Sequence, residues 1–141
     1  MFLDSSGLIC KLFRVQWNEL AKAQFRAAAL LVRAESGERP SCSRAYYAAY
    51  ALVAHRLEPA NITYAFGWKN PAHADLPRYV AQIAGIGPAS KRAIRRALRR
   101  LRQRREDADY RPRITVDPSA ARESLRDAAE LFRILGESHE P

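Results

Sequence analysis

Cysteine is scarce in this sequence and long hydrophobic runs are missing, and each shortage excludes a class of protein. The two cysteines, Cys10 and Cys42, are too few for a disulfide scaffold or a cysteine-only metal site. The longest uninterrupted apolar run covers only residues 45–54, whereas a membrane-spanning helix needs roughly 20 residues. The first fifteen residues show no secretory signal pattern. We therefore expect a cytoplasmic protein without a membrane-spanning segment.

The chain also lacks the common motifs of cofactor and metal binding. It has no glycine pattern of the Walker or dinucleotide-binding type. Its cysteines and its three histidines show no metal-ligand spacing such as C-x-x-C or H-x-x-x-H. The sequence therefore predicts no cofactor and no metal.

What the sequence does contain is the composition of one globular domain. Of its 141 residues, 48% are apolar and 28% are charged. This is enough apolar material for one core, and it excludes disorder over most of the length. We expect a single domain over residues 1–141, with its core at about 15–137, a short N-terminal extension and a C-terminal tail.

Positive charge is concentrated in one short stretch. The net charge is +9, and residues 91–105 contain nine basic residues and no acidic one. The remaining chain has 24 − 9 = 15 basic against 15 acidic residues and is neutral. A concentration of this kind attracts polyanions such as nucleic acid. An acidic protein partner and a merely solvated helix face are the alternatives. The residues expected to contact nucleic acid are Arg92, Arg95, Arg96, Arg99 and Arg100.

The apolar spacing is helical throughout, and the alternation typical of strands is absent. Helices are expected at about 15–35, 43–57 and 74–85, followed by a basic helix that ends before a break at 109–117 and by a last helix that Gly136 stops. Ser41 or Ser43, Ser90 and Asp117 are the expected N-caps. The second helix is apolar almost all round and belongs in the middle of the fold. The sequence predicts an all-α, up-and-down bundle of four to five antiparallel helices.

Two arginines are expected to face inward. At 100° per residue, Arg105 lies about 20° from Ile94, which belongs to the apolar stripe of the basic helix. Arg44 shares a face with Tyr47 in the apolar second helix. A buried guanidinium keeps its charge and needs an anion beside it. Two interpretations are open: structural ion pairs, with Asp107 or Asp109 as the nearest partner of Arg105 in sequence, or a polar groove that receives phosphate.

Three short segments carry a resemblance to a known family. They are Ser43-Arg44-Ala45-Tyr46-Tyr47-Ala48, His73-Ala74-Asp75-Leu76 and Arg105-Glu106-Asp107-Ala108-Asp109-Tyr110. The first and last are similar to the S-R-x-Y-Y-A and R-x-x-A-D-Y signatures of the HEPN superfamily (higher eukaryotes and prokaryotes nucleotide-binding). These all-helical domains are common in bacterial toxin–antitoxin and defence loci. The resemblance covers residues 15–137 and makes the expected bundle HEPN-like.

The resemblance implies a dimer with a polar groove at its interface and a function in RNA or nucleotide binding. Many members are metal-independent ribonucleases, in which a histidine acts as acid and base while an arginine holds the phosphate oxygens. Others are non-catalytic, and several are encoded beside a nucleotidyltransferase partner. By this resemblance the candidate catalytic residues are Arg44, His73 and Arg105, and the candidate groove residues are Tyr47, Asp109 and Tyr110.

One departure from the family pattern leaves catalysis open. The ribonucleases separate their arginine and histidine by four to six residues, and here only Arg133 and His139 have that spacing. Arg133 falls on the outer face of the last helix, and Ile134 stands where the family usually has a polar residue. The chain is therefore expected to be either a ribonuclease with another arrangement or a non-catalytic module that dimerises or binds a nucleotidyltransferase. A helix-hairpin-helix DNA contact at residues 85–88 is a weaker alternative to an ordinary hinge.

Overall fold

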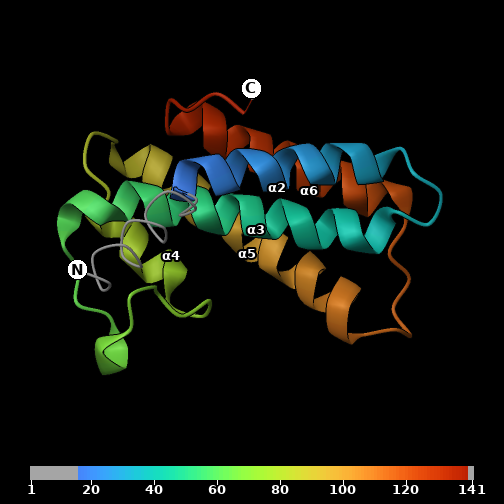
Figure 1. Ribbon diagram of the computed structural model, residues 1–141, viewed down its shortest axis with the longest axis horizontal. Helices are drawn as coiled ribbons and strands as arrows, with labels where there is room; N and C mark the ends of the chain where they lie inside the picture. The colour runs from blue at the N-terminus through green and yellow to red at the C-terminus, as the bar shows by residue number, and fades with distance from the viewer. Residues whose placement is uncertain (1–15, 140–141) are drawn as a thin grey trace, which may run out of the picture.

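The regular elements of the described chain are all helical and form a bundle. The computed structural model describes residues 16–139, and no strand occurs among them. The α-helices of this part are α2 (Trp17–Val32), α3 (Glu38–Leu57), α4 (Leu76–Tyr79), α5 (Pro88–Tyr110) and α6 (Pro118–Ile134). The long helices α2, α3, α5 and α6 alternate in direction (Figure 1). The predicted all-α, up-and-down architecture is confirmed.

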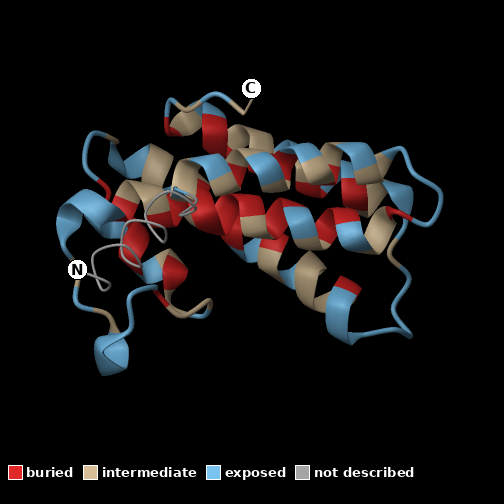
Figure 2. Ribbon diagram, viewed as in Figure 1, coloured by how far each residue is buried: buried red, intermediate tan, exposed pale blue. Residues whose placement is uncertain are grey.

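Helix α3 is the centre of the bundle, as its apolar surface predicts. It packs against α2, α5 and α6, and buried residues run along most of its length (Figure 2). Tyr46, Leu52 and Leu57 of α3 are almost fully buried, together with Leu101 of α5 and Phe132 of α6. The burial of such side chains is the main stabilising contribution to the bundle, at roughly 1.5–3 kcal/mol for each one.

The start of α3 differs from the prediction. The helix begins at Glu38, with Gly37 as N-cap, so Ser41 and Ser43 lie inside it and cap nothing. Pro40 is tolerated because it falls in the first turn, where no backbone N–H is required. A Cβ at Gly37 would lie 1.9 Å from the carbonyl oxygen of Leu31, so this turn accepts only glycine.

The third helix is much shorter than predicted. α4 covers only Leu76–Tyr79, and a 3₁₀ turn, Val80–Gln82, follows it. The apolar residues at positions 76, 79, 80 and 83 are nevertheless buried, because a turn of α-helix followed by a 3₁₀ turn directs them inward as well. His73 therefore lies in the loop before α4.

The basic helix is longer than predicted at both ends. α5 begins at Pro88 after Gly87, so Ser90 is not its N-cap, and it continues to Tyr110 instead of breaking at Asp109. Asp117 is confirmed as the N-cap of α6, because its Oδ1 accepts a hydrogen bond from the Ala120 N–H at 2.8 Å. Across residues 16–139, no helix has both the length and the apolar character needed to cross a membrane.

Candidate functional site

The two signature segments meet where α3 packs against α5. Ser43 Oγ donates a hydrogen bond to Asp109 Oδ2 at 3.1 Å. Arg105 Nη2 donates to the hydroxyl of Tyr47 at 2.7 Å and to that of Tyr110 at 2.9 Å. Arg105 Nε lies 3.1 Å from Asp109 Oδ2, so the predicted pairing of these two residues is confirmed. We call these five residues the motif junction.

Arg105 is held by several contacts within its own chain. Its side chain is 13% exposed, and its guanidinium carbon lies 4.8 Å from the ring centre of Tyr110 and 5.3 Å from that of Tyr47. The contact at Nε is an ion pair without the alignment of a hydrogen bond. Stacking, hydrogen bonds and a carboxylate together compensate for removing the cation from water. The inward position predicted for Arg105 is therefore correct.

Arg44 does not face inward, which corrects the prediction. It is exposed, and its Nη1 donates a hydrogen bond to Gln24 Oε1 of α2 at 3.3 Å. It still borders an open groove of about 620 Å³ beside Arg105. We call this hollow the Arg105 groove; its lining residues are Arg39, Pro40, Ser43, Arg44, Tyr47, Arg105, Ala108, Asp109 and Tyr110.

Arg39 has a structural function that the sequence did not reveal. Its Nη1 donates to the carbonyl oxygens of Asp107 and Ala108 at 2.9 and 3.0 Å, and its Nη2 contacts that of Ile114. The last carbonyls of a helix have no partner inside the helix. Arg39 supplies that partner at the end of α5, and so it fixes the segment that carries Arg105 and Asp109.

His73 lies between α3 and α5, in surroundings that disfavour a charged ring. Its Nδ1 is 2.7 Å from the hydroxyl of Tyr46, and its ring centre is 4.6 Å from that of Tyr50. Burial lowers the pKa of His73, and the positive charges of Arg105 and Arg102 lower it further. Burial also raises the pKa of Tyr46 far above its usual value. At neutral pH, therefore, an uncharged imidazole meets a protonated phenol.

His73 also borders a pocket of about 340 Å³ that is rich in arginine. We call it the arginine pocket; it is lined by Tyr46, His73, Ala74, Leu76, Pro77, Arg78, Arg95, Leu98, Arg99 and Arg102. Four guanidinium groups thus meet at one hollow, and no carboxylate is among its lining residues. The arrangement favours an anion with several oxygen atoms, because each guanidinium presents a fork of N–H donors.

Two of these four arginines are partly neutralised at the pocket's edge. Arg102 Nε lies 3.0 Å from Glu106 Oε1, and Arg78 Nη2 lies 3.8 Å from Asp75 Oδ2. Arg95 Nε donates to the carbonyl oxygen of Pro77 at 3.3 Å, which orients the side chain and leaves its charge in place. Among residues 16–139, Arg95 and Arg99 therefore supply the pocket charge that no carboxylate balances.

The arginines predicted to contact nucleic acid divide into three groups. Arg95 and Arg99 line the arginine pocket. Arg92 and Arg96 are exposed and line none of the hollows described here. Arg100 binds Asp127 of α6 through two hydrogen bonds of 3.1 and 2.9 Å. Because this ion pair joins α5 to α6, Arg100 is poorly placed to contact a polyanion.

Arg102 and Arg78 were not among the candidate residues predicted from the sequence. Arg102 follows Arg95 and Arg99 at steps of four and three, which places all three on one face of a helix. That spacing is the signal that identifies Arg102. Arg78 has no such signal, because only the folding of α4 against α5 brings it to the pocket.

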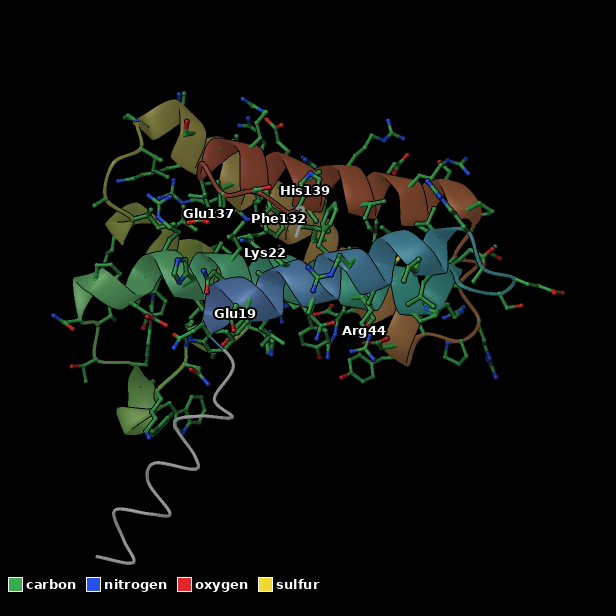
Figure 3. The ribbon with its side chains drawn as sticks, turned by 45° about the horizontal axis from the view of Figure 1, so that its top comes forward. Glu19, Lys22, Arg44, Phe132, Glu137 and His139 are labelled. Atoms are coloured by element: carbon green, nitrogen blue, oxygen red, sulfur yellow. The ribbon has the colours of Figure 1, made fainter. Side chains whose placement is uncertain are left out.

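Arg133 and His139 do not form a site together. Arg133 is exposed and its Nε binds Glu130 Oε2 at 2.7 Å. The ring centre of His139 lies 4.4 Å from that of Phe25 and 5.7 Å from that of Phe132. Figure 3 shows His139 beside Phe132 and well apart from Arg44. This histidine packs the C-terminal tail onto the bundle.

Between residues 16 and 139, no three His, Cys, Asp or Glu side chains cluster as metal ligands would. Cys10 lies outside the described residues.

A family model described as HEPN domain matches residues 15–138. No curated protein and no solved structure matches the chain.

Proposed function

Because the chain belongs to the HEPN domain family, we propose that it binds RNA or a nucleotide through the phosphate groups. The observation that supports this proposal is the arginine pocket, where four arginines and His73 line one hollow without a carboxylate. Guanidinium groups keep their charge at any physiological pH and bind phosphate oxygens in pairs. Contacts of this kind hold the phosphate backbone and do not read the base sequence.

The phosphate contacts are tested by the salt dependence of RNA binding. Four contacts predict that affinity for a single-stranded RNA falls about 50-fold between 50 and 200 mM salt. The double variant Arg95→Glu, Arg99→Glu reverses the two unbalanced charges and should weaken binding by about tenfold or more. The measurement is fluorescence anisotropy with a labelled RNA.

The matched control reverses two charges elsewhere. Arg122 and Arg126 are exposed on α6 and line none of the hollows described above, so Arg122→Glu, Arg126→Glu changes the net charge equally. Binding should change much less in this variant. Equal weakening in the two double variants would mean that only the overall charge matters, and the proposed pocket would be wrong.

Cleavage of the bound RNA is a second function that one observation favours. His73 is an uncharged imidazole that borders the arginine pocket, and a general base must be uncharged to accept a proton. In this reaction the 2′-hydroxyl attacks the adjacent phosphorus, a 2′,3′-cyclic phosphate forms, and the 5′-oxygen leaves with a proton. His73 would accept the proton of the 2′-hydroxyl and, once protonated, donate a proton to the departing 5′-oxygen, while the pocket arginines stabilise the charge on the phosphate oxygens.

The alternative is a non-catalytic module that dimerises or binds a nucleotidyltransferase partner. It is favoured by the separation of Arg133 from His139, because the spacing typical of the family's ribonucleases produces no site here. A function in a bacterial toxin–antitoxin or defence system, in the cytoplasm, agrees with either possibility. This context rests on the family membership alone.

One assay separates the two possibilities. Purified protein is incubated with RNA and a chelator, and wild type is compared with His73→Ala, Arg105→Ala and Arg44→Ala. A ribonuclease should lose cleavage in His73→Ala and keep it in His139→Ala, which alters only the packing on Phe25 and Phe132. Absence of cleavage, together with a stable complex with a partner chain, would support the non-catalytic module.

A further inference from the structure

A hollow of about 290 Å³ lies beside the arginine pocket and has a different character. Its lining residues are Trp17, Leu20, Gln24, Tyr47, Tyr50, Ala51, Asn70 and His73, and we call it the aromatic slot. None of these residues is an acid, an arginine or a lysine. The slot shares His73 with the arginine pocket and Tyr47 with the Arg105 groove.

The aromatic walls of the slot are fixed in place. The rings of Trp17 and Tyr50 are in edge contact, with centres 5.9 Å apart. The Tyr50 hydroxyl donates a hydrogen bond to the carbonyl oxygen of Pro71 at 2.6 Å, and its ring packs on His73. Because these contacts are made within the chain, a flat ligand would enter without first ordering the walls.

The slot lies between two groups of arginines. Beyond His73 are Arg95 and Arg99 of the arginine pocket. Beyond Tyr47 is the Arg105 groove, where three arginines stand against one carboxylate, Asp109. Positive charge therefore borders the aromatic slot on two sides, next to His73 and next to Tyr47. A nucleic-acid strand has the complementary order of phosphate, base and phosphate.

We propose that the aromatic slot receives one unpaired base of a nucleic-acid strand, while the two phosphates that flank this base bind in the arginine pocket and the Arg105 groove. The proposal rests on the proposed phosphate binding and adds the class of ligand. A base inside a duplex cannot stack on a protein ring, so the ligand is single-stranded. The amides of Gln24 and Asn70 at the slot supply donors and acceptors for the edge of the base.

Small ligands test this proposal without altering the protein. Nucleoside 3′,5′-bisphosphates carry one base between two phosphates, and 1-O-methylribofuranose 3,5-bisphosphate carries the same phosphates without a base. Isothermal titration calorimetry is carried out with the 3′,5′-bisphosphates of the four common nucleosides. At least one of them should bind about 5- to 140-fold more tightly than the abasic compound, which corresponds to the binding free energy of one stacked base. Equal affinity of all five compounds would overturn the base slot and leave the proposed phosphate binding intact.

A pair of tryptophan variants locates the base. Trp17→Leu keeps an apolar side chain at the slot but removes the ring, so nucleoside bisphosphates should then bind no better than the abasic compound. Trp68→Leu is the matched control, because Trp68 is exposed and does not line the slot; it should keep the preference for a base. Thermal unfolding checks that both variants are folded.

The other outcomes of these experiments distinguish failure of the aromatic slot from failure of phosphate binding. A base preference that survives in folded Trp17→Leu would place the base elsewhere and overturn the slot. If Trp17→Leu unfolds, the comparison of ligands with wild type still decides. Absence of binding by every bisphosphate, abasic or not, would overturn both the proposed phosphate binding and the slot.

Discussion

At the scale of single residues, His73 combines features that the sequence shows only separately. The loop before α4 places its ring against Tyr46 and Tyr50, and the arginines of α5 act on its charge. Its pKa is lowered first by burial and then by Arg105 and Arg102. The histidine was identified as a candidate by family resemblance, but its contacts depend on residues more than twenty positions away in the chain.

The pH titration of His73 is the first prediction. Its NMR-observed pKa should lie below the ordinary value of 6.5. As pH falls through 6.5, the unfolded chain binds a proton at this residue before the folded chain does, so His73 lowers the free energy of unfolding in that range. Comparison with His73→Gln assigns the resonance. A midpoint at or above 6.5 would contradict the burial and the arginine neighbours described here.

The second prediction compares Arg105, which is largely buried and paired, with Arg44, which is exposed. Arg105→Ala leaves Asp109 without its ion pair and two tyrosine hydroxyls without their donor, and it should lower the free energy of unfolding by about 1–3 kcal/mol. Arg44 is exposed and has one long hydrogen bond, so Arg44→Ala should cost less than about 0.5 kcal/mol. Urea unfolding measures both. Equal losses would mean that Arg105 is not held as described.

At the scale of elements, where α3 begins and where α5 ends determine which side chains meet around Arg105. Arg105 and Asp109 are neighbours on one helix face only because α5 continues to Tyr110. The sequence predicted a break at Asp109, since it gave no sign that Arg39 binds the final carbonyls of the helix. Arg39 is separated from Asp107 and Ala108 by 68 and 69 positions in the sequence, so local spacing does not reveal this contact.

The third prediction concerns this contact. Arg39→Ala should increase amide hydrogen exchange in the last turn of α5 and lower the free energy of unfolding by about 1–2 kcal/mol, because several helix-end carbonyls lose their donor. Arg39→Lys should recover little, since an ammonium lacks the planar fork. Arg33→Ala, at an exposed position on the C-cap of α2, is the control. Unchanged exchange at residues 107–110 in Arg39→Ala would exclude this function of Arg39.

At the scale of the whole molecule, the sequence predicted the bundle well and its hollows poorly. The apolar spacing of α2, α3, α5 and α6 is sufficient to specify four packed helices, and the family model agrees. The arginine pocket was not predictable in the same way. Arg95, Arg99 and Arg102 share a helix face, but Arg78 and His73 reach that face through a loop and a single helical turn. The outward position of Arg44 was missed because the first turns of α3 leave one face exposed, at Pro40 and Arg44, although Ser41 and Cys42 between them are buried.

Phosphate binding in the arginine pocket is tested most directly by NMR observation of the arginine Nε–Hε groups during titration with a single-stranded RNA oligonucleotide. The resonances of Arg95, Arg99 and Arg102 should shift most and saturate together, while those of Arg122 and Arg126 on α6 should remain almost unchanged. Shifts of similar size at all exposed arginines, or none at Arg95 and Arg99 while the RNA is bound, would contradict the assignment of this pocket.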